Sequence, residues 1–166
     1  MNLEQASYLA EIIGVVLVVA SLIYVARQLR QNTDAIRAQS RQAVLTAAQA
    51  ELFAEMENPD IVTSIVKAGA LSQEEHIKLA AWLFAVLRVR QFSWLQHRNG
   101  AIDDSQWNTE VSVIRFIFDS KKTRDWWTKI GHLAFGDEFS EFINSEIRDH
   151  LPTEKAWQSV ANWTDP

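Results

Sequence analysis

Hydrophobic positions dominate the first part of the chain without interruption. Residues 12 to 26 read IIGVVLVVASLIYVA and carry no charge, and extension back to Tyr8 adds only Glu11. A helix rises about 1.5 Å per residue, so about 20 apolar residues cross the hydrocarbon core of a bilayer, which is about 30 Å thick. The pattern therefore predicts one membrane-spanning helix, and a lipid bilayer is the first expected partner.

The residues that flank this segment indicate its orientation. Tyr8 and Tyr24 stand near its two ends, and tyrosine is favoured at the membrane interface. The first eleven residues hold no Lys or Arg, whereas a juxtamembrane basic set follows the segment: Arg27, Arg30, Arg37 and Arg41. Because basic residues stay on the cytoplasmic side, we expect a single-pass protein of the cell inner membrane, with its N-terminus outside and its C-terminal domain in the cytoplasm.

Three other interpretations of the apolar segment compete with a membrane span. A secretory signal peptide requires a basic N-terminal region, but here that region carries Glu4 and Glu11 instead. An in-plane amphipathic helix has one apolar face, whereas residues 12 to 19 are apolar all round. A helix buried in a soluble oligomer stays open as an interpretation, because the run is near the lower length limit for a span.

The helical pattern continues beyond the apolar segment. No Gly or Pro occurs from Val15 to Asn58, and strong helix formers dominate this region. The composition predicts one continuous helix from about Leu3 to Glu57. A sevenfold apolar stripe along it is too interrupted by polar residues for a strong coiled coil; its members are Val15, Leu22, Leu29, Ile36 and Ala43.

Start and stop signals divide the rest of the chain into about five further helices. Asn58 is expected to cap a helix over residues 60–68, with Pro59 at its first position. A capping box from Ser72 to Glu75 opens a central helix that runs to Arg98. Further helices are predicted over 103–118, 120–130 and 137–151. Period-two alternation is not sustained anywhere, so the predicted fold class is all-α, a long N-terminal transmembrane helix that continues into a cytoplasmic bundle.

Composition and charge add domain limits and exclude one class of partner. The expected domains are a membrane anchor over 1–30, a cytoplasmic α-helical domain over 31–152 and a C-terminal tail over 153–166. Seven Trp and eight Phe can fill the core of the helical domain. The net charge of −5 offers no general footprint for nucleic acid, so no nucleic-acid partner is expected.

Motifs for catalysis, cofactors or metals do not stand out. The four histidines, His76, His97, His132 and His150, lie in different segments, and none has a second His or Cys at ligand spacing. The chain has no Cys, no nucleophile motif and no glycine-rich phosphate loop. We therefore expect a protein that is not an enzyme, without catalytic residues, a cofactor or a metal site.

Two stretches are candidates for binding. On the predicted central helix, cations alternate with aromatic residues, and this pattern fits either solvated or paired arginines or a pocket for an anion or lipid headgroup; the candidates are Arg88, Arg90, His97 and Arg98. Trp126 and Trp127 are adjacent on a short predicted helix. Tandem Trp favours core packing, with an interaction surface as the alternative.

Several motifs in a fixed order resemble a family of small, uncharacterised bacterial membrane-anchored proteins. After the apolar helix comes ARQLRQNT from Ala26 to Thr33, then Asn58-Pro59-Asp60. The turn that carries His97, Gly100 and Asp103 is followed by Trp107 and later by the Trp126-Trp127 pair. The family has no assigned activity. The resemblance implies a single-span, membrane-tethered all-α protein and carries over no catalytic residues.

Three function classes follow from these expectations. The first is a membrane-anchored interaction or scaffold protein that self-associates or serves a membrane complex as an accessory subunit. Small residues in the predicted span support this class, because they let transmembrane helices approach closely; they include Gly14, Ala20 and Ser21. The second is a membrane-linked sensor that binds an anion or lipid headgroup through Arg88 to Arg98. The third, a pore-forming assembly, is less favoured because the span lacks a polar stripe.

Overall fold

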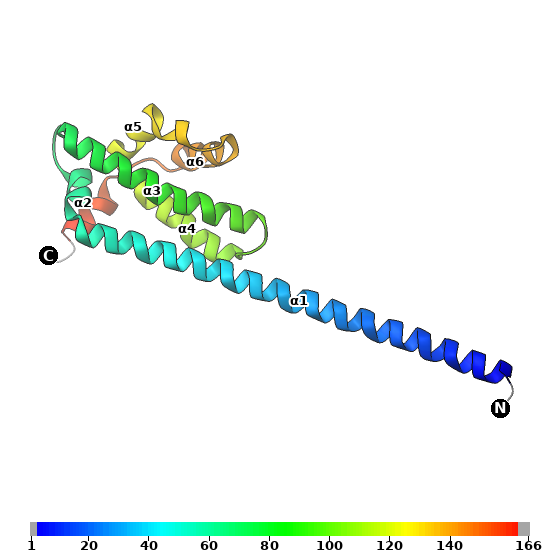
Figure 1. Cartoon of the computed structure of the whole chain (residues 1–166). Coiled ribbons are helices and arrows are strands. Elements are labelled where there is room, and N and C mark those ends of the chain that lie inside the picture. Colours follow the sequence, from blue (N-terminus) through cyan, green and yellow to red (C-terminus); the bar gives the residue numbers. More distant parts are fainter. Residues whose placement is uncertain (1–2, 163–166) are drawn as a thin grey trace. The chain divides into compact units, whose positions relative to one another are not determined.

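The computed structural model describes residues 3–162, and every regular element in this range is helical. The elements are α1 (Leu3–Glu57), α2 (Pro59–Val66), α3 (Gln73–Arg98), α4 (Asp104–Ile117), α5 (Lys121–Lys129), the 3-10 helix η1 (Gly131–Ala134), α6 (Asp137–Asp149) and α7 (Lys155–Ala161). The predicted all-α class is confirmed (Figure 1). The chain divides into two units, residues 1–39 and residues 40–166.

The first unit is the N-terminal part of α1. This helix runs from Leu3 to Glu57 without a break, as the absence of Gly and Pro after Gly14 predicts. Two of its hydroxyl groups bond within the helix: that of Ser21 donates to the carbonyl of Leu17 (2.8 Å), and that of Thr33 to the carbonyl of Leu29 (3.0 Å). These hydroxyls therefore need no partner outside α1.

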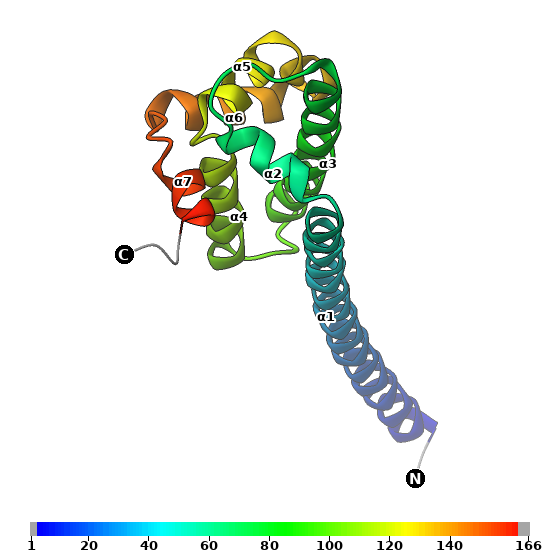
Figure 2. The same cartoon turned by 90° about the vertical axis from the view of Figure 1, so that its left-hand side faces the viewer.

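The second unit is organised around α3. This helix contacts α2, α4 and η1, and it buries side chains on more than one face. Figure 2 shows α2 and α4 beside it. Among the side chains that α3 contributes to the core, Leu83 and Leu87 are completely buried. Burial on several sides explains why the apolar residues of this segment do not follow a single stripe.

Aromatic residues from α4, α5 and α6 complete the core of the second unit. Phe118 packs edge-on against Trp127 (ring centroids 5.9 Å apart), and Phe139 packs edge-on against Trp94 of α3 (5.7 Å). Such edge-to-face pairs are favourable because the positive ring edge meets the negative ring face. The Trp-rich and Phe-rich second half of the sequence thus forms one core cluster.

The capping box at the start of α3 is present. The backbone N–H of Glu75 donates to the hydroxyl of Ser72 (3.2 Å), and the Ser72 N–H donates to the Glu75 carboxylate (2.7 Å). Lys67 also donates to this carboxylate at 2.7 Å. The hydrogen bonds from Lys67 and then from the Ser72 backbone lower the pKa of Glu75 to about 2.

The predicted second helix is two residues too long at its C-terminal end. Asn58 occupies the N-cap position and Pro59 begins the helix, as predicted, but the Asn58 side chain makes no capping hydrogen bond. The side-chain amide of Asn58 does not cap α2; it donates backward to the carbonyl of Ala54 in α1 (3.0 Å). The helix ends at Val66 rather than at Ala68. Lys122 of α5 provides the reason, because its ammonium donates to the final carbonyls of α2, including that of Ser64 (3.0 Å).

The segment that sequence analysis describes as a C-terminal tail contains a helix. Residues 155–161 form α7, and Trp157 is 5% exposed. Its ring packs against Phe116 (4.4 Å between centroids) and edge-on against Trp82 (6.2 Å). Asp119 holds the start of this helix by accepting from the backbone N–H groups of Thr153 (2.7 Å) and Ala156 (3.0 Å).

Candidate functional site

The apolar side chains of α1 are exposed along the predicted span. From Ile12 to Val25 the large hydrophobic side chains are 48–66% exposed. This helix is long and apolar enough to cross a membrane, with a mean hydropathy of 2.2 in its most apolar stretch. A run of apolar side chains this long requires cover from lipid or from another protein.

Three of the four basic residues that follow the apolar segment are exposed as well. Arg27, Arg30 and Arg37 lie in the first unit with exposed side chains, and Arg41 in the second unit is half-buried. At about 100° per residue, the spacing of the first three places them within an arc of about 80° on one face of α1. They form a basic stripe directly after the apolar segment.

The four candidates on α3 do not meet in one pocket. Arg88 donates to the carbonyl of Ala134 (2.7 Å) and lies over the ring of Phe135 (4.7 Å). Arg98, near the other end of the stretch, pairs with Glu138 and lies over the ring of Trp94. Both guanidinium groups already have a carbonyl or carboxylate and an aromatic face as partners.

His97 and Arg90 point to other parts of the second unit. The ring of His97 stacks on Trp107 (5.4 Å between centroids), and its Nε2 lies 2.9 Å from a carboxylate oxygen of Asp104. Arg90 is 5% exposed, and its guanidinium lies 2.6 Å from Glu51 of α1. Each candidate thus has a separate environment, and the structure assembles no common anion site from them.

Arg90 is instead the centre of a buried charge cluster. Besides Glu51, its guanidinium pairs with Glu110 of α4 at 3.0 Å, and the three side chains are between 6% and 13% exposed. The cluster borders a cavity of about 350 Å³ that Trp82 and Trp157 also line. Sequence reasoning missed both glutamates because they lie 39 and 20 positions from Arg90 and carry no local motif.

The two tandem tryptophans belong to the core, which is the alternative that sequence analysis favours for them. Trp127 is 2% exposed, and its indole N–H donates to the side-chain oxygen of Asn144 (2.9 Å). Trp126 is 9% exposed, but within residues 3–162 its indole nitrogen has no hydrogen-bond partner. Only Trp126 therefore remains a candidate for binding.

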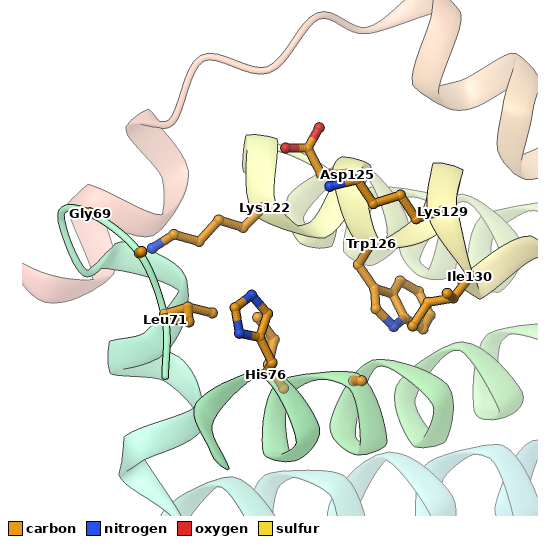
Figure 3. A pocket seen from close by; sticks show the side chains of 11 residues that line it. Gly69, Leu71, His76, Lys122, Asp125, Trp126, Lys129 and Ile130 are labelled. Atoms are coloured by element: carbon orange, nitrogen blue, oxygen red, sulfur yellow. The ribbon is translucent and has the colours of Figure 1, made fainter. Parts of the chain in front are cut away.

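Trp126 lines a half-open cavity of about 340 Å³ beside α3 and α5 (Figure 3). Its apolar lining includes Leu71 and Leu79 from the α3 side and Ile130 after the end of α5. Its polar lining includes His76 of α3 and Lys122 of α5. A concave, mostly apolar space with a few polar groups is the usual form of a small-molecule site.

Three residues with charged side chains line this cavity, two lysines and one aspartate. Lys122 and Lys129 line it with one carboxylate, that of Asp125. In Figure 3 the Asp125 carboxylate points away from His76 and Trp126. Burial lowers the pKa of Lys122, whose ammonium is held by the α2 carbonyls. The Lys129 ammonium is drawn next to Asp125 in the same figure, so these two charges lie together, away from His76 and Trp126.

Two neighbours fix the ring of Trp126. A Cβ atom added to Gly131 would lie 2.6 Å from the indole ring, so only glycine fits behind it. Phe84 of α3 packs edge-on against the same indole, with centroids 4.9 Å apart. The ring is thus held by close packing, which sequence could not show, although Gly131 directly after a predicted helix was a visible signal.

Among residues 3–162, no group of three His, Cys, Asp or Glu side chains is arranged so that it could hold a metal ion. Comparison with family models, with curated proteins and with solved structures gives no match to this chain.

Proposed function

We propose that this protein is a membrane-anchored helical interaction protein. In this proposal α1 crosses the inner membrane once with its N-terminus outside, and the second unit works in the cytoplasm as a scaffold or as an accessory subunit of a membrane complex. The observation that carries it is the exposed apolar run from Ile12 to Val25, followed by the basic stripe.

A lipid bilayer is the environment that best fits the exposed apolar run from Ile12 to Val25. Its side chains are apolar on every side of the helix, so a single protein partner on one face would leave the rest in water. Burial of apolar surface is worth about 25 cal/mol per Å², and a bilayer supplies it around the whole circumference. Arg27 can extend its guanidinium to the headgroups at the cytoplasmic end.

The absence of Cys allows a direct test of this topology. We would introduce one cysteine at a time, Ser7→Cys before the span or Thr128→Cys in α5, at positions whose side chains are exposed. A membrane-impermeant maleimide should label the Ser7→Cys variant in intact cells and the Thr128→Cys variant only after lysis. Labelling of both from the same side, or release of the protein by alkaline carbonate, would overturn the proposal.

Self-association through the span is part of the same proposal. Gly14 and Ser21 are seven positions apart and lie on one face of α1, where small side chains permit close helix packing. A Cβ atom at Gly14 meets nothing within 4 Å, so a larger residue there does not disturb the fold of one chain. Any effect of such a residue on assembly would therefore report on a contact between chains.

Light scattering in mild detergent tests this contact. We expect the wild-type protein to be larger than a monomer and Gly14→Leu to shift it toward the monomer. Val16→Leu is the matched control, because it lies about 200° around the helix from Gly14. A monomeric wild-type protein, or equal effects of the two variants, would contradict self-association through this face.

A further inference from the structure

One side of α1 carries no charged residue from position 22 to position 39. The four charged residues of this stretch lie together on the opposite side, at about 100° per residue: Arg27, Arg30, Asp34 and Arg37. The uncharged side holds a row of exposed residues at heptad spacing, which we call the seam: Leu22, Val25, Leu29, Asn32, Ile36 and Gln39. Lipid headgroups and water accept charges on every side of a helix. Confinement of the charges to one side therefore indicates a contact along the other side.

Two surface hollows lie along this seam, one heptad apart. Each is lined by four residues at positions i, i+3, i+4 and i+7 of α1, together with one residue beside them. These sets are Val18, Ser21, Leu22 and Val25, with Leu17, and Val25, Gln28, Leu29 and Asn32, with Gln31. Four residues at this spacing form the hole into which one side chain of a facing helix inserts in coiled-coil packing.

A second copy of this chain is the occupant that matches both hollows. Copies that are anchored in one membrane by the same span point in the same direction, so their α1 helices meet in parallel. In a parallel, in-register pair, Leu22 and Leu29 of each copy enter the hollow that contains the same leucine of the other copy. Two-fold symmetry then makes the contact self-complementary, and no second sequence is required.

Asn32 supports a partner of the same sequence. Its side-chain amide has both a donor and an acceptor, so two Asn32 side chains that face each other can pair. One polar residue at such a position fixes the register of a coiled coil at a cost in stability. The face also continues into the predicted span, because Gly14 lies 18 positions, or five full turns, before Asn32 on the same line of the helix.

We propose that residues 22–39 of α1 pair with the same residues of a second copy, in parallel and in register, as a stem that continues the transmembrane contact beyond the bilayer. The inference rests on the proposed span and self-association, and adds their face, direction and register. A bilayer that ends near Val25 does not reach Ile36, about 16 Å of helix further on, where the second copy would cover a side chain that is 52% exposed. Asn32 and Gln39 weaken the seam, but chains held in one membrane meet at high effective concentration.

Disulfide cross-linking in isolated membranes tests the face and the register. Because the chain has no Cys, single replacements can place one thiol per chain on the seam, with Leu29→Cys, Asn32→Cys or Ile36→Cys, or on the opposite side, with Arg30→Cys or Asp34→Cys. A disulfide requires Cα atoms within about 7 Å of each other. Under mild oxidation the three seam variants should therefore form covalent dimers, and the two others should stay monomeric on denaturing gels.

A charge on the seam tests the same contact without cross-linking. Leu29 is 62% exposed in the single chain, so Leu29→Glu leaves the fold of that chain intact. In light scattering we expect the dimer affinity to fall at least about tenfold, because two leucines leave the contact and two like charges enter it. Ala38→Glu is the matched control, since Ala38 is exposed about 180° around α1 from Leu29, and it should leave the affinity unchanged.

The possible results separate the stem from the proposed function. A monomeric wild-type protein would overturn both. An oligomer that Gly14→Leu disrupts, but that forms no disulfide at the three seam positions, would keep self-association in the span and overturn the stem. Equal cross-linking on both sides of α1, or equal effects of Leu29→Glu and Ala38→Glu, would also overturn the stem.

Discussion

Gly131 shows how a single residue determines the shape of the candidate cavity. It lies directly against the indole of Trp126, and this ring forms one wall of the cavity. A methyl group at residue 131 would have to move the ring or the backbone, because protein interiors are closely packed. Because Gly131 has no side chain, the indole ring of Trp126 can occupy this position.

Gly131→Ala tests this packing. We expect it to lower the free energy of unfolding by about 1–3 kcal/mol, which is typical of forced overpacking. Gly136→Ala is the control, since a Cβ atom there meets nothing within 4 Å, and its effect should be smaller. Urea denaturation followed by circular dichroism measures both variants. Equal stability of the two would contradict the tight contact with Trp126.

The buried charge cluster around Arg90 is a second place where a single residue is expected to determine stability. Arg90→Met would remove the buried guanidinium that pairs with the carboxylates of Glu51 and Glu110. Loss of one partner from a buried pair costs about 3–5 kcal/mol, and urea denaturation should show a loss of this size. Arg115→Met is the control, because Arg115 is 44% exposed in its pair with Glu146 and such pairs contribute at most about 1 kcal/mol.

A combined variant separates charge from packing at the same place. When Arg90→Met is joined with Glu51→Gln and Glu110→Gln, no buried carboxylate remains in the cluster, so most of the lost stability should return. A triple variant as unstable as Arg90→Met alone would show that the arginine acts through its shape rather than its charge.

At the scale of elements, the Asp119 carboxylate holds the start of α7. Burial raises the pKa of Asp119, but the hydrogen bonds from Thr153 and Ala156 together outweigh burial and hold this pKa below its ordinary value. A carboxyl whose pKa is lower in the folded state stabilises the fold above its unfolded pKa, and this stabilisation is lost as the pH falls below that value. Attachment of α7 should therefore weaken in acid.

Asp119→Ala should detach α7 at neutral pH without unfolding the core. Hydrogen exchange is the measurement, and the amides of residues 155–161 should lose protection while those of α3 keep theirs. Thr109→Ala is the control, since its hydroxyl bonds only within α4. In wild-type protein the same amides should lose protection only as the pH falls through the folded pKa of Asp119, which lies below the ordinary aspartate value of about 3.9. Unchanged protection in the variant would contradict this role of Asp119.

The capped helices were predictable because their signals are local. Ser72 and Glu75 open α3 as predicted, and Asp103 caps α4 through the N–H of Gln106 (2.9 Å). The end of α2 and the whole of α7 could not be predicted from the sequence, because Lys122 and Asp119 contact them from distant parts of the chain. Local patterns thus predicted boundaries only where no distant side chain competed for the backbone.

At the scale of the whole molecule, the exposed run of α1 is the feature on which the proposed membrane anchor depends. Val18 is 60% exposed in the middle of this run, so a change there does not touch the helical core. Val18→Arg would place a charge near the centre of a bilayer at a cost of about 2.5–3.5 kcal/mol. The proposed anchor is therefore open to a test that leaves the second unit intact.

Membrane fractionation after expression measures the effect of Val18→Arg. We expect a clear decrease in the membrane-embedded fraction, with Val18→Leu behaving like the wild type. The helical domain should stay folded in both variants, which circular dichroism of the purified proteins checks. A Val18→Arg protein that still resists alkaline carbonate extraction as the wild type does would contradict a span centred on this residue.

The sequence by itself determined the helical class, the long α1, the apolar segment with its basic flank, and most helix starts. These features depend on the order of residues within a few turns, where periodicity, capping and the lack of Gly and Pro act directly. Sequence proximity also suggested one site from Arg88 to Arg98, although successive residues on a helix point in different directions.

Tertiary structure alone decided which side chains meet. It placed Arg90 between Glu51 and Glu110, gave Arg88 and Arg98 separate partners, and left the indole N–H of Trp126 unpaired at a cavity. These pairs come from helices far apart in the chain, and their distances follow from how the helices pack. No local pattern specifies that packing, because it is set by the combined burial of the whole core.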